Sequence, residues 1–167
     1  AASLAVGARC LRLARPVEAL PKGVVPVASI ACAARFLSEN PGRALLTTGS
    51  KELVPYTRVA DFAERFFVRV LPLPGAIMKC IDAGFSPSHV IGMQGPFTRE
   101  LNEAMLRQVG AQWLVTKDSG TVGGTAEKLA AARDVGARCI VITRPAEGGG
   151  ALSLREVEDA LLREFAR

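Results

Sequence analysis

Short apolar runs alternate with amphipathic segments along most of this chain. The apolar runs are typical of strands buried on both faces, and we expect strands at 10–14, 43–47, 66–70, 90–93, 113–115 and 138–142. Helical spacing of apolar residues predicts helices at 30–37 (begun by Ser29) and 75–83, between Thr98 and Gly110, from Thr125 to Gly136 and from Ser153 onward, with single turns at 52–56 and 61–65. About six alternations predict an α/β fold: a Rossmann-like, doubly wound, mostly parallel sheet with helices on both faces.

Two of the predicted helices show which residues should face the core. In the helix after Thr98 these are Leu101, Ala104, Met105 and Val109. In the last helix, which Ser153 and Glu156 open as a capping box, they are Leu154, Val157, Leu161 and Phe165. The segment 17–25 lies among Pro16, Pro21 and Pro26, and its composition indicates a linker.

Polar, glycine-containing turns follow several of the predicted strands. The run at 113–115 leads into Thr116-Lys117-Asp118-Ser119-Gly120, and the run at 43–47 leads into Thr48-Gly49-Ser50-Lys51. A third turn, 94–97, follows the run at 90–93. Ligands of open α/β sheets bind at the carboxyl ends of the strands, where backbone N–H groups and helix dipoles favour anions. We therefore expect these turns to line up on one edge and to form a ligand site.

Composition narrows the classes of partner. The chain has 167 residues, of which 49% are hydrophobic but only 5% aromatic, so its core is aliphatic. The net charge of +5 comes from scattered Lys and Arg residues; without a basic run or an aromatic ladder we do not expect nucleic acid as a partner. The four cysteines form no CxxC pair and there is one histidine, His89, so no metal site is predicted. No apolar stretch is long enough for a membrane span, and we expect a cytoplasmic protein with free thiols.

The ordered turns carry a family resemblance. Residues 45–51 (LLTTGSK), 92–98 (GMQGPFT), 114–120 (LVTKDSG) and 142–145 (ITRP) resemble the precorrin-6A reductase family, and 11–16 (LRLARP) is similar to a segment in the middle of the family's chains. The forms MQGPF and KDSG are closer to the cobalt-precorrin branch. The resemblance runs from about Arg9 onward.

The resemblance implies an activity and a division of the chain. Members of this family reduce one carbon–carbon double bond of precorrin-6A or cobalt-precorrin-6A with NADPH or NADH during cobalamin biosynthesis. They are longer, and they begin with another Rossmann-like half. We accordingly expect residues 1–40 to be the end of that half and a linker, and 41–167 to be a C-terminal Rossmann-like domain that forms one side of the cofactor and substrate cleft.

On this interpretation the turns supply the binding residues. The expected cofactor-binding residues are Thr48, Gly49, Ser50, Gly95, Pro96, Ser119 and Gly120. Cationic and flat side chains suit a tetrapyrrole that carries many carboxylates; the expected substrate-binding residues are Lys51, Lys117, Asp118, Arg144 and Phe97, with Arg69 as a weaker candidate. No catalytic side chain is assigned, because the cofactor supplies the hydride.

Each of these residues also has a purely structural interpretation. On that interpretation the cations are solvated surface residues, the hydroxyls cap helices, Phe97 packs in the core, and Asp118 forms an Asx-turn. Two other functions therefore remain open: a non-catalytic nucleotide- or tetrapyrrole-binding module, and a flavodoxin-like interaction domain without a ligand. Both binding functions require residues 47–51, 94–98 and 117–124 to converge.

Overall fold

The computed structural model describes residues 11–13, 19–119, 124–144 and 151–165. The chain divides into two compact units. Leu20–Arg144 forms one, which we call the sheet unit, and Ala1–Ala19 with Pro145–Arg167 forms the other, which we call the terminal unit. Residues 20–40 of the predicted first segment thus belong to the sheet unit. That residues 1–40 end an earlier half of a longer chain stays a prediction.

The sheet unit is a six-stranded parallel sheet in the order β2-β7-β6-β3-β4-β5. Its strands are β2 (Val25–Val27), β3 (Ala44–Leu46), β4 (Phe66–Val70), β5 (Val90–Gly92), β6 (Trp113–Lys117) and β7 (Arg138–Ile142). The predicted α/β fold with a doubly wound, parallel sheet is confirmed. The predicted bounds of β4 and β7 are those of the structure.

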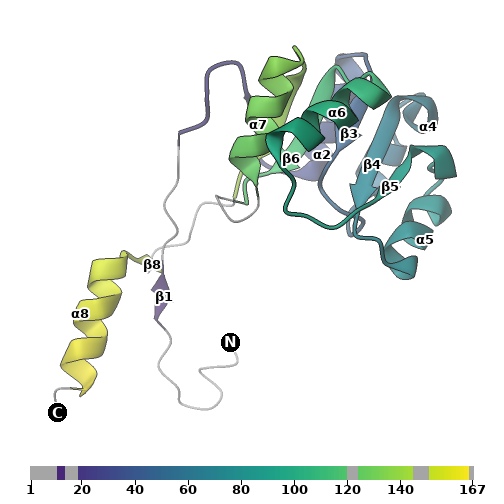
Figure 1. Ribbon diagram of the computed structural model, residues 1–167. Coiled ribbons are helices and arrows are strands. Elements are labelled where there is room, and N and C mark those ends of the chain that lie inside the picture. Colours follow the sequence, from purple (N-terminus) through teal and green to yellow (C-terminus); the bar gives the residue numbers. More distant parts are fainter. Residues whose placement is uncertain (1–10, 14–18, 120–123, 145–150, 166–167) are drawn as a thin grey trace. The chain divides into compact units, whose positions relative to one another are not determined.

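Helices cover both faces of this sheet. They are α2 (Ile30–Glu39), α3 (Val54–Thr57), α4 (Phe62–Arg65), α5 (Pro74–Asp82), α6 (Arg99–Val109) and α7 (Thr125–Asp134), with a 3-10 turn η1 at Pro87–His89. One core cluster joins the sheet to α2, α3 and α5, and a second joins it to α6 and α7. Figure 1 shows α6 and α7 side by side on one face, which we call the α6–α7 face.

Local signals fix several helix ends as predicted. The Oγ1 of Thr98 accepts a hydrogen bond from the backbone N–H of Leu101 at 3.3 Å, and Ser29 caps α2 in the same way through Cys32 at 3.2 Å. Gly110 ends α6 with a φ of 62°, a left-handed conformation that glycine adopts without strain.

The predicted core face of α6 is confirmed for Met105 and Val109 and is wrong for Leu101 and Ala104, which are exposed. Its buried residues are Asn102, Met105, Leu106 and Val109, whereas Leu101 is 39% exposed. The reason is Asn102, which is 2% exposed and donates from Nδ2 to the carbonyl oxygen of Thr98 at 2.8 Å. A buried amide with satisfied hydrogen bonds replaces an apolar side chain at this position.

Three elements lie in the described residues of the terminal unit. Strands β1 (Arg12–Leu13) and β8 (Ala151–Leu152) pair in parallel, and α8 spans Leu154–Phe165. The capping box is confirmed: Glu156 Oε2 accepts from the backbone N–H of Ser153 at 2.7 Å, and Ser153 Oγ accepts from the N–H of Glu156 at 3.3 Å. The prediction that the apolar stripe of α8 faces a core is wrong, since no described residue of α8 is buried and Phe165 is 83% exposed.

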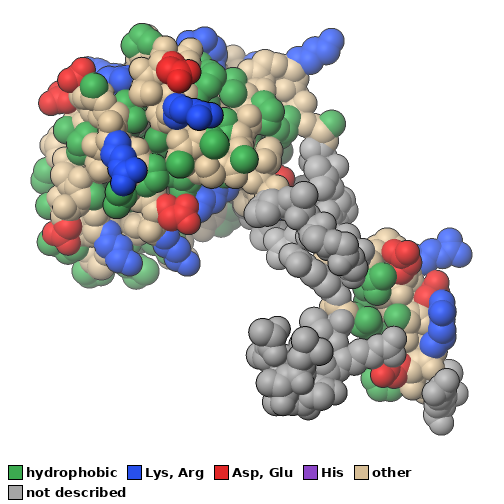
Figure 2. Space-filling view, turned by 180° about the vertical axis from the view of Figure 1, so that it is seen from behind, with side chains coloured by type: hydrophobic (Ala, Val, Ile, Leu, Met, Phe, Trp, Pro, Cys, Tyr) green, Lys and Arg blue, Asp and Glu red, His purple; other side chains and the backbone are tan. Residues whose placement is uncertain are grey.

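Charges of both signs are mixed on the face that Figure 2 shows. Figure 2 shows acidic and basic side chains interspersed with apolar ones on the larger body, without a broad area of one sign. Among the helices that the structure describes, none has the length and apolar character to cross a membrane.

Candidate functional site

The winding of the sheet reverses between β3 and β6. These strands are neighbours, but the connection after β3 leads to α3 on one face, and the connection after β6 leads to α7 on the opposite face. At such a reversal the two connections diverge and leave room for a ligand beyond the carboxyl ends of the strands. The turns at 47–51 and 117–119, both predicted as ligand turns, lie at this point.

The turn after β3 is anchored to β6 by Thr47. Its backbone N–H and its Oγ1 both donate to the carbonyl oxygen of Val115, each at 2.8 Å. Thr48 is buried, and its hydroxyl lies 3.5 Å from that of Tyr56; burial raises the pKa of Tyr56 to about 12. The side chain of Thr48 therefore lies in the interior.

The tip of the same turn is open. Gly49 has a φ of 79°, and a Cβ atom built on it would meet no atom within 4 Å. A ligand can thus approach the backbone at Gly49, and glycine is needed there for its backbone conformation. Ser50 is half-buried and Lys51 is exposed.

The turn after β6 is tied to the end of β7. The Arg144 guanidinium donates from Nη2 to Asp118 Oδ1 and from Nε to the Asp118 carbonyl oxygen, both at 3.1 Å. The backbone N–H of Asp118 donates to Ile142 at 2.9 Å. Two predicted substrate residues therefore contact each other, and they hold the turn beside Lys117, which is exposed.

The remainder of this turn leads into α7. The N–H and Oγ of Ser119 lie 3.3 and 3.1 Å from Thr125 Oγ1. Ser119 thus contacts the first residue of α7, and it is exposed. Gly120 lies outside the described residues.

The turn after β5 contains a cis peptide bond between Gly95 and Pro96. Both residues are exposed. A Cβ on Gly95 would come within 2.9 Å of the ring of Phe97, so the ring requires glycine at this position. Phe97 itself is half-buried, and the guanidinium carbon of Arg69 lies 4.0 Å from its centroid.

The three turns lie at one edge of the sheet because all six strands are parallel. Those after β3 and β6 are adjacent, and Arg144 follows the neighbouring strand β7. The turn after β5 is two strands away from β3, about 10 Å at the usual spacing of strands. A ligand would have to extend across β4 to contact Gly95, Pro96 or Phe97.

Two buried cations lie near this edge: Arg69, which the sequence offered as a weaker candidate, and Lys128, which it did not single out. Arg69 in β4 is 5% exposed, which overturns its interpretation as a surface cation, and Lys128 in α7 is 9% exposed. Burial lowers the pKa of Arg69 to about 10. The sequence does contain a signal for their burial, because each cation occupies a position where the strand or helix pattern demands an apolar residue.

No metal-binding arrangement is found in the described part of the chain, where no three His, Cys, Asp or Glu side chains group together. Cys80 and Cys139 are buried free thiols, and Cys32 is a free, half-buried thiol. His89 stacks on Phe67 with ring centroids 3.9 Å apart, a packing role.

Comparisons with known proteins agree on one family. The family profile described as precorrin-6x reductase CbiJ/CobK matches residues 1–163. The cobalt-precorrin-6A reductase of Methanothermobacter thermautotrophicus is 39% identical over 81% of this chain and 45% of its own length. That of Priestia megaterium is 36% identical over 79% of this chain and 53% of its own length, and that of Salmonella typhimurium is 40% identical over 70% and 44%.

A solved structure shares the fold. It is a CobK precorrin-6A reductase with a TM-score of 0.72 and 23% identity, and the match covers 98% of this chain and 65% of that one. The chain spans about half the length of the curated relatives it matches.

Proposed function

The chain belongs to the precorrin-6x reductase CbiJ/CobK family, and from this premise we propose that it forms one side of a site where a carbon–carbon double bond of precorrin-6A or cobalt-precorrin-6A is reduced by NADPH or NADH. The observation that carries the proposal is the reversal between β3 and β6, flanked by the turns at 47–51 and 117–119. The reduction serves cobalamin biosynthesis.

The residues at this edge suit a dinucleotide. Gly49 offers backbone without an overlying side chain, and Ser50 adds a half-buried hydroxyl. α7 begins beside Ser119 and directs its N-terminal dipole at the same edge, which favours a phosphate. We keep as proposed cofactor-binding residues those expected from the sequence, namely Thr48, Gly49, Ser50, Gly95, Pro96, Ser119 and Gly120. Thr48 would contribute through its backbone. When bound, the nicotinamide supplies the hydride.

The cations at the edge suit the acidic side chains of the substrate. Lys117 and Lys51 are exposed and can each attract a carboxylate. Arg144 has donors beyond the two that bind Asp118, since a guanidinium carries five. Asp118 acts as a positioning residue that fixes Arg144. Phe97 offers a flat apolar surface for a macrocycle.

The other side of the proposed site would come from the additional half that the longer relatives contain. Because the relatives are about twice as long as the matched region, we propose the additional half as the partner that closes the site and excludes water. The same difference in length favours one second candidate: this chain alone binds the nucleotide or the tetrapyrrole without turnover.

The test is an anaerobic absorbance titration of this chain with precorrin-6A or its cobalt form, followed by NADPH or NADH. We expect a spectral shift on binding, and oxidation of the nucleotide if this half suffices. Lys117→Gln should weaken tetrapyrrole binding about tenfold, whereas Lys79→Gln, an exposed lysine in the last turn of α5, should not. Binding without turnover selects the binding module. The absence of any shift, in a folded sample, contradicts both.

A further inference from the structure

Two arginines of the sheet unit, Arg65 and Arg69, are held by the protein in different ways. Arg65 ends α4 and donates from each of its nitrogens to a backbone carbonyl oxygen: Nε to Gly42 at 3.1 Å, Nη1 to Ala60 at 3.4 Å and Nη2 to Leu37 at 3.0 Å. Every nitrogen of Arg65 is thus engaged within the chain, as expected of an arginine whose role is structural.

Arg69 in β4 uses only one of its nitrogens. Its Nη1 donates to Asn102 Oδ1 at 2.9 Å and contacts Met105 Sδ at 3.6 Å. Within the described ranges, Nε and Nη2 make no hydrogen bond. These two nitrogens lie on the same side of the planar guanidinium group, and we call them the fork, because together they can bind both oxygens of one carboxylate.

The fork of Arg69 is not sealed in the core, although the whole residue is only 5% exposed. Among the buried side-chain nitrogen and oxygen atoms of the described residues, only His89 Nδ1 lacks a hydrogen-bond partner. Since Nε and Nη2 of Arg69 also lack a partner, they are not fully enclosed by the described residues. The fork therefore opens toward the surface. Because Arg69 is the fourth of five residues in β4, this opening lies near the carboxyl edge of the sheet.

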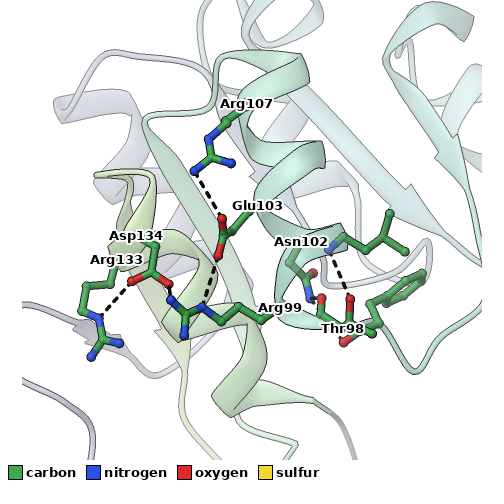
Figure 3. A network of polar contacts seen from close by, with 9 residues as sticks. Thr98, Arg99, Asn102, Glu103, Arg107, Arg133 and Asp134 are labelled. Atoms are coloured by element: carbon green, nitrogen blue, oxygen red, sulfur yellow. Dashed lines mark hydrogen bonds and ion pairs between the residues drawn. The ribbon is translucent and has the colours of Figure 1, made fainter.

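The orientation of the fork is fixed from its other side. Asn102, which holds Nη1, is 2% exposed and donates from Nδ2 to the carbonyl oxygen of Thr98 at 2.8 Å. Figure 3 shows Asn102 beside Thr98 at the start of α6. The guanidinium carbon of Arg69 also lies 4.0 Å from the ring centroid of Phe97. A donor group that is held in one orientation before binding loses less entropy when a ligand arrives.

The charge of Arg69 has no acidic partner within the described residues. The carboxylates in Figure 3 are engaged elsewhere: Glu103 pairs with Arg99 and Arg107, and Asp134 pairs with Arg99. Burial lowers the pKa of Arg69 only to about 10, so the side chain is still charged at neutral pH. Buried charges are normally paired, and a carboxylate at the fork would supply the missing partner.

A structural role accounts for part of this arrangement. The hydrogen bond to Asn102 and the stacking on Phe97 explain how Arg69 ties β4 to α6 and to the turn before it. They leave the fork unused, in contrast to Arg65, whose nitrogens are all engaged.

We propose that Arg69 binds a carboxylate of the tetrapyrrole through Nε and Nη2, and that Asn102 is the positioning residue that aims this fork. The identity of the ligand rests on the proposed function. The carboxylate would lie beside Phe97, in the neighbourhood of the turn after β5. That turn is two strands, about 10 Å, from the turn after β3, so the carboxylate and a dinucleotide at the reversal of the sheet do not compete.

The deciding experiment compares the Nε–H protons of Arg69 and Arg65 in the unmodified chain. Their hydrogen exchange is followed by NMR with and without uroporphyrin, a tetrapyrrole polycarboxylate. A bound carboxylate should slow exchange at Arg69 Nε about tenfold, because its oxygen shields the proton. Exchange at Arg65 Nε, which already donates to Gly42, should stay constant. An unchanged rate at Arg69 would overturn the proposal.

A matched pair of variants separates binding from structure. Arg69→Lys keeps a positive charge but has no fork, and it should weaken uroporphyrin binding about tenfold in a calorimetric titration. Arg65→Lys removes structural hydrogen bonds just before the opposite end of β4, and it should leave the affinity unchanged. Urea midpoints identify the temperature at which both variants are folded. Equal affinities of folded Arg69→Lys and the unmodified chain would contradict the proposal.

A titration with NADP⁺ identifies the anion. Slower exchange at Arg69 Nε with NADP⁺ but not with uroporphyrin would assign the fork to a phosphate and overturn the carboxylate. If uroporphyrin protects Arg69 while precorrin-6A is neither bound nor reduced, the proposed function fails and the carboxylate site stands. If reduction is observed while Arg69 stays unprotected, the site fails and the proposed function stands.

Discussion

In the sheet unit six strands share one parallel sheet, with a packed core on each face, whereas the terminal unit pairs two strands of two residues each beside one helix. Every buried hydrophobic residue of the described chain lies between Ile30 and Ile142. In the terminal unit, Leu154, Leu162 and Phe165 are more than half exposed.

The sheet unit is stabilised by contacts between residues far apart in sequence, whereas α8 of the terminal unit is stabilised at its start by contacts between residues close in sequence. The elements of the sheet unit bury apolar area against one another, and burial is the dominant favourable term in folding. In the described part of the terminal unit no hydrophobic side chain is buried, a two-stranded sheet is at best marginally stable, and the capping box is a local interaction. Changes in the core should therefore alter global unfolding, and changes in α8 should act locally.

The largest effect is expected for Trp113→Ala in the sheet unit. Trp113 is 0% exposed, lies edge-on to Phe36 at 5.2 Å between centroids, and donates from Nε1 to Pro41 at 3.3 Å. Its truncation should lower the free energy of unfolding by about 3–5 kcal/mol. Urea denaturation measures this change. It is followed by circular dichroism and not by tryptophan fluorescence, because the variant lacks the only tryptophan.

The matched control is Met78→Ala, a large apolar side chain in the same unit that is 51% exposed. It should change the free energy of unfolding by less than about 0.5 kcal/mol. If the two variants were equally stable, the packed core would not be what distinguishes this unit.

The next effect is a loss of stability at alkaline pH through Cys139. Burial raises the pKa of this thiol from 9.0 to about 11. The folded chain then keeps the proton up to about pH 11, while the unfolded chain releases it above pH 9. The contribution of the protonated Cys139 thiol to the free energy of unfolding is therefore fully present below pH 9. It is lost as the pH rises to 11, and the loss amounts to at most about 2–3 kcal/mol.

Two variants isolate this contribution. Cys139→Ala and Cys139→Val both remove the thiol but differ in volume, so they should differ in stability at pH 7 yet share a flatter dependence between pH 9 and 11. Urea midpoints under reducing conditions measure the slopes. If stability still falls between pH 9 and 11 in both variants, a group other than Cys139 causes the pH dependence.

The contrast between the units also explains what the sequence predicted well. Strands β4 and β7 have the predicted bounds because their apolar runs are buried on both faces, which leaves a continuous signal. Strand β2 is not among the predicted strands: the expected linker at 17–25 includes its first residue, Val25, and Pro26 follows. Proline is tolerated there since β2 is an edge strand that pairs only with β7, so its missing N–H can face the open side.

At the candidate site, the turns could be predicted but their pairings could not. Each turn follows an apolar run, so its place at the carboxyl edge comes from local pattern. The contact of Asp118 with Arg144 and the cluster of Arg69, Phe97 and Asn102 join residues far apart in sequence. Only the order of the strands brings them together, and local periodicity carries no information on that order.

A smaller, local effect is expected for Ser153→Ala in the terminal unit. This substitution removes the hydroxyl that caps α8 through Glu156, and should cost the helix about 1 kcal/mol. NMR amide shifts of α8 should move toward coil values, while the urea midpoint of the sheet unit stays unchanged. A shifted midpoint would show that the two units unfold together.

The same cap should make α8 sensitive to acid. Hydrogen bonds from Ser153 lower the pKa of Glu156 below its ordinary value of 4.5. The stabilisation is therefore present above pH 4.5 and is lost as the pH falls through the lowered value. α8 amide signals of the unmodified chain should show this acid transition, and those of Ser153→Ala should show a smaller one, because only the backbone N–H of residue 153 then still donates to Glu156.

The smallest effect is expected for Leu162→Gln. Its side chain is 68% exposed in α8, so exchanging it for a polar residue of similar length removes little buried apolar area and keeps a good helix former. The free energy of unfolding should change by less than about 0.5 kcal/mol, as measured by the same urea titration. A loss as large as that of Trp113→Ala would break the comparison, because the apolar face of α8 would then have to be covered in solution.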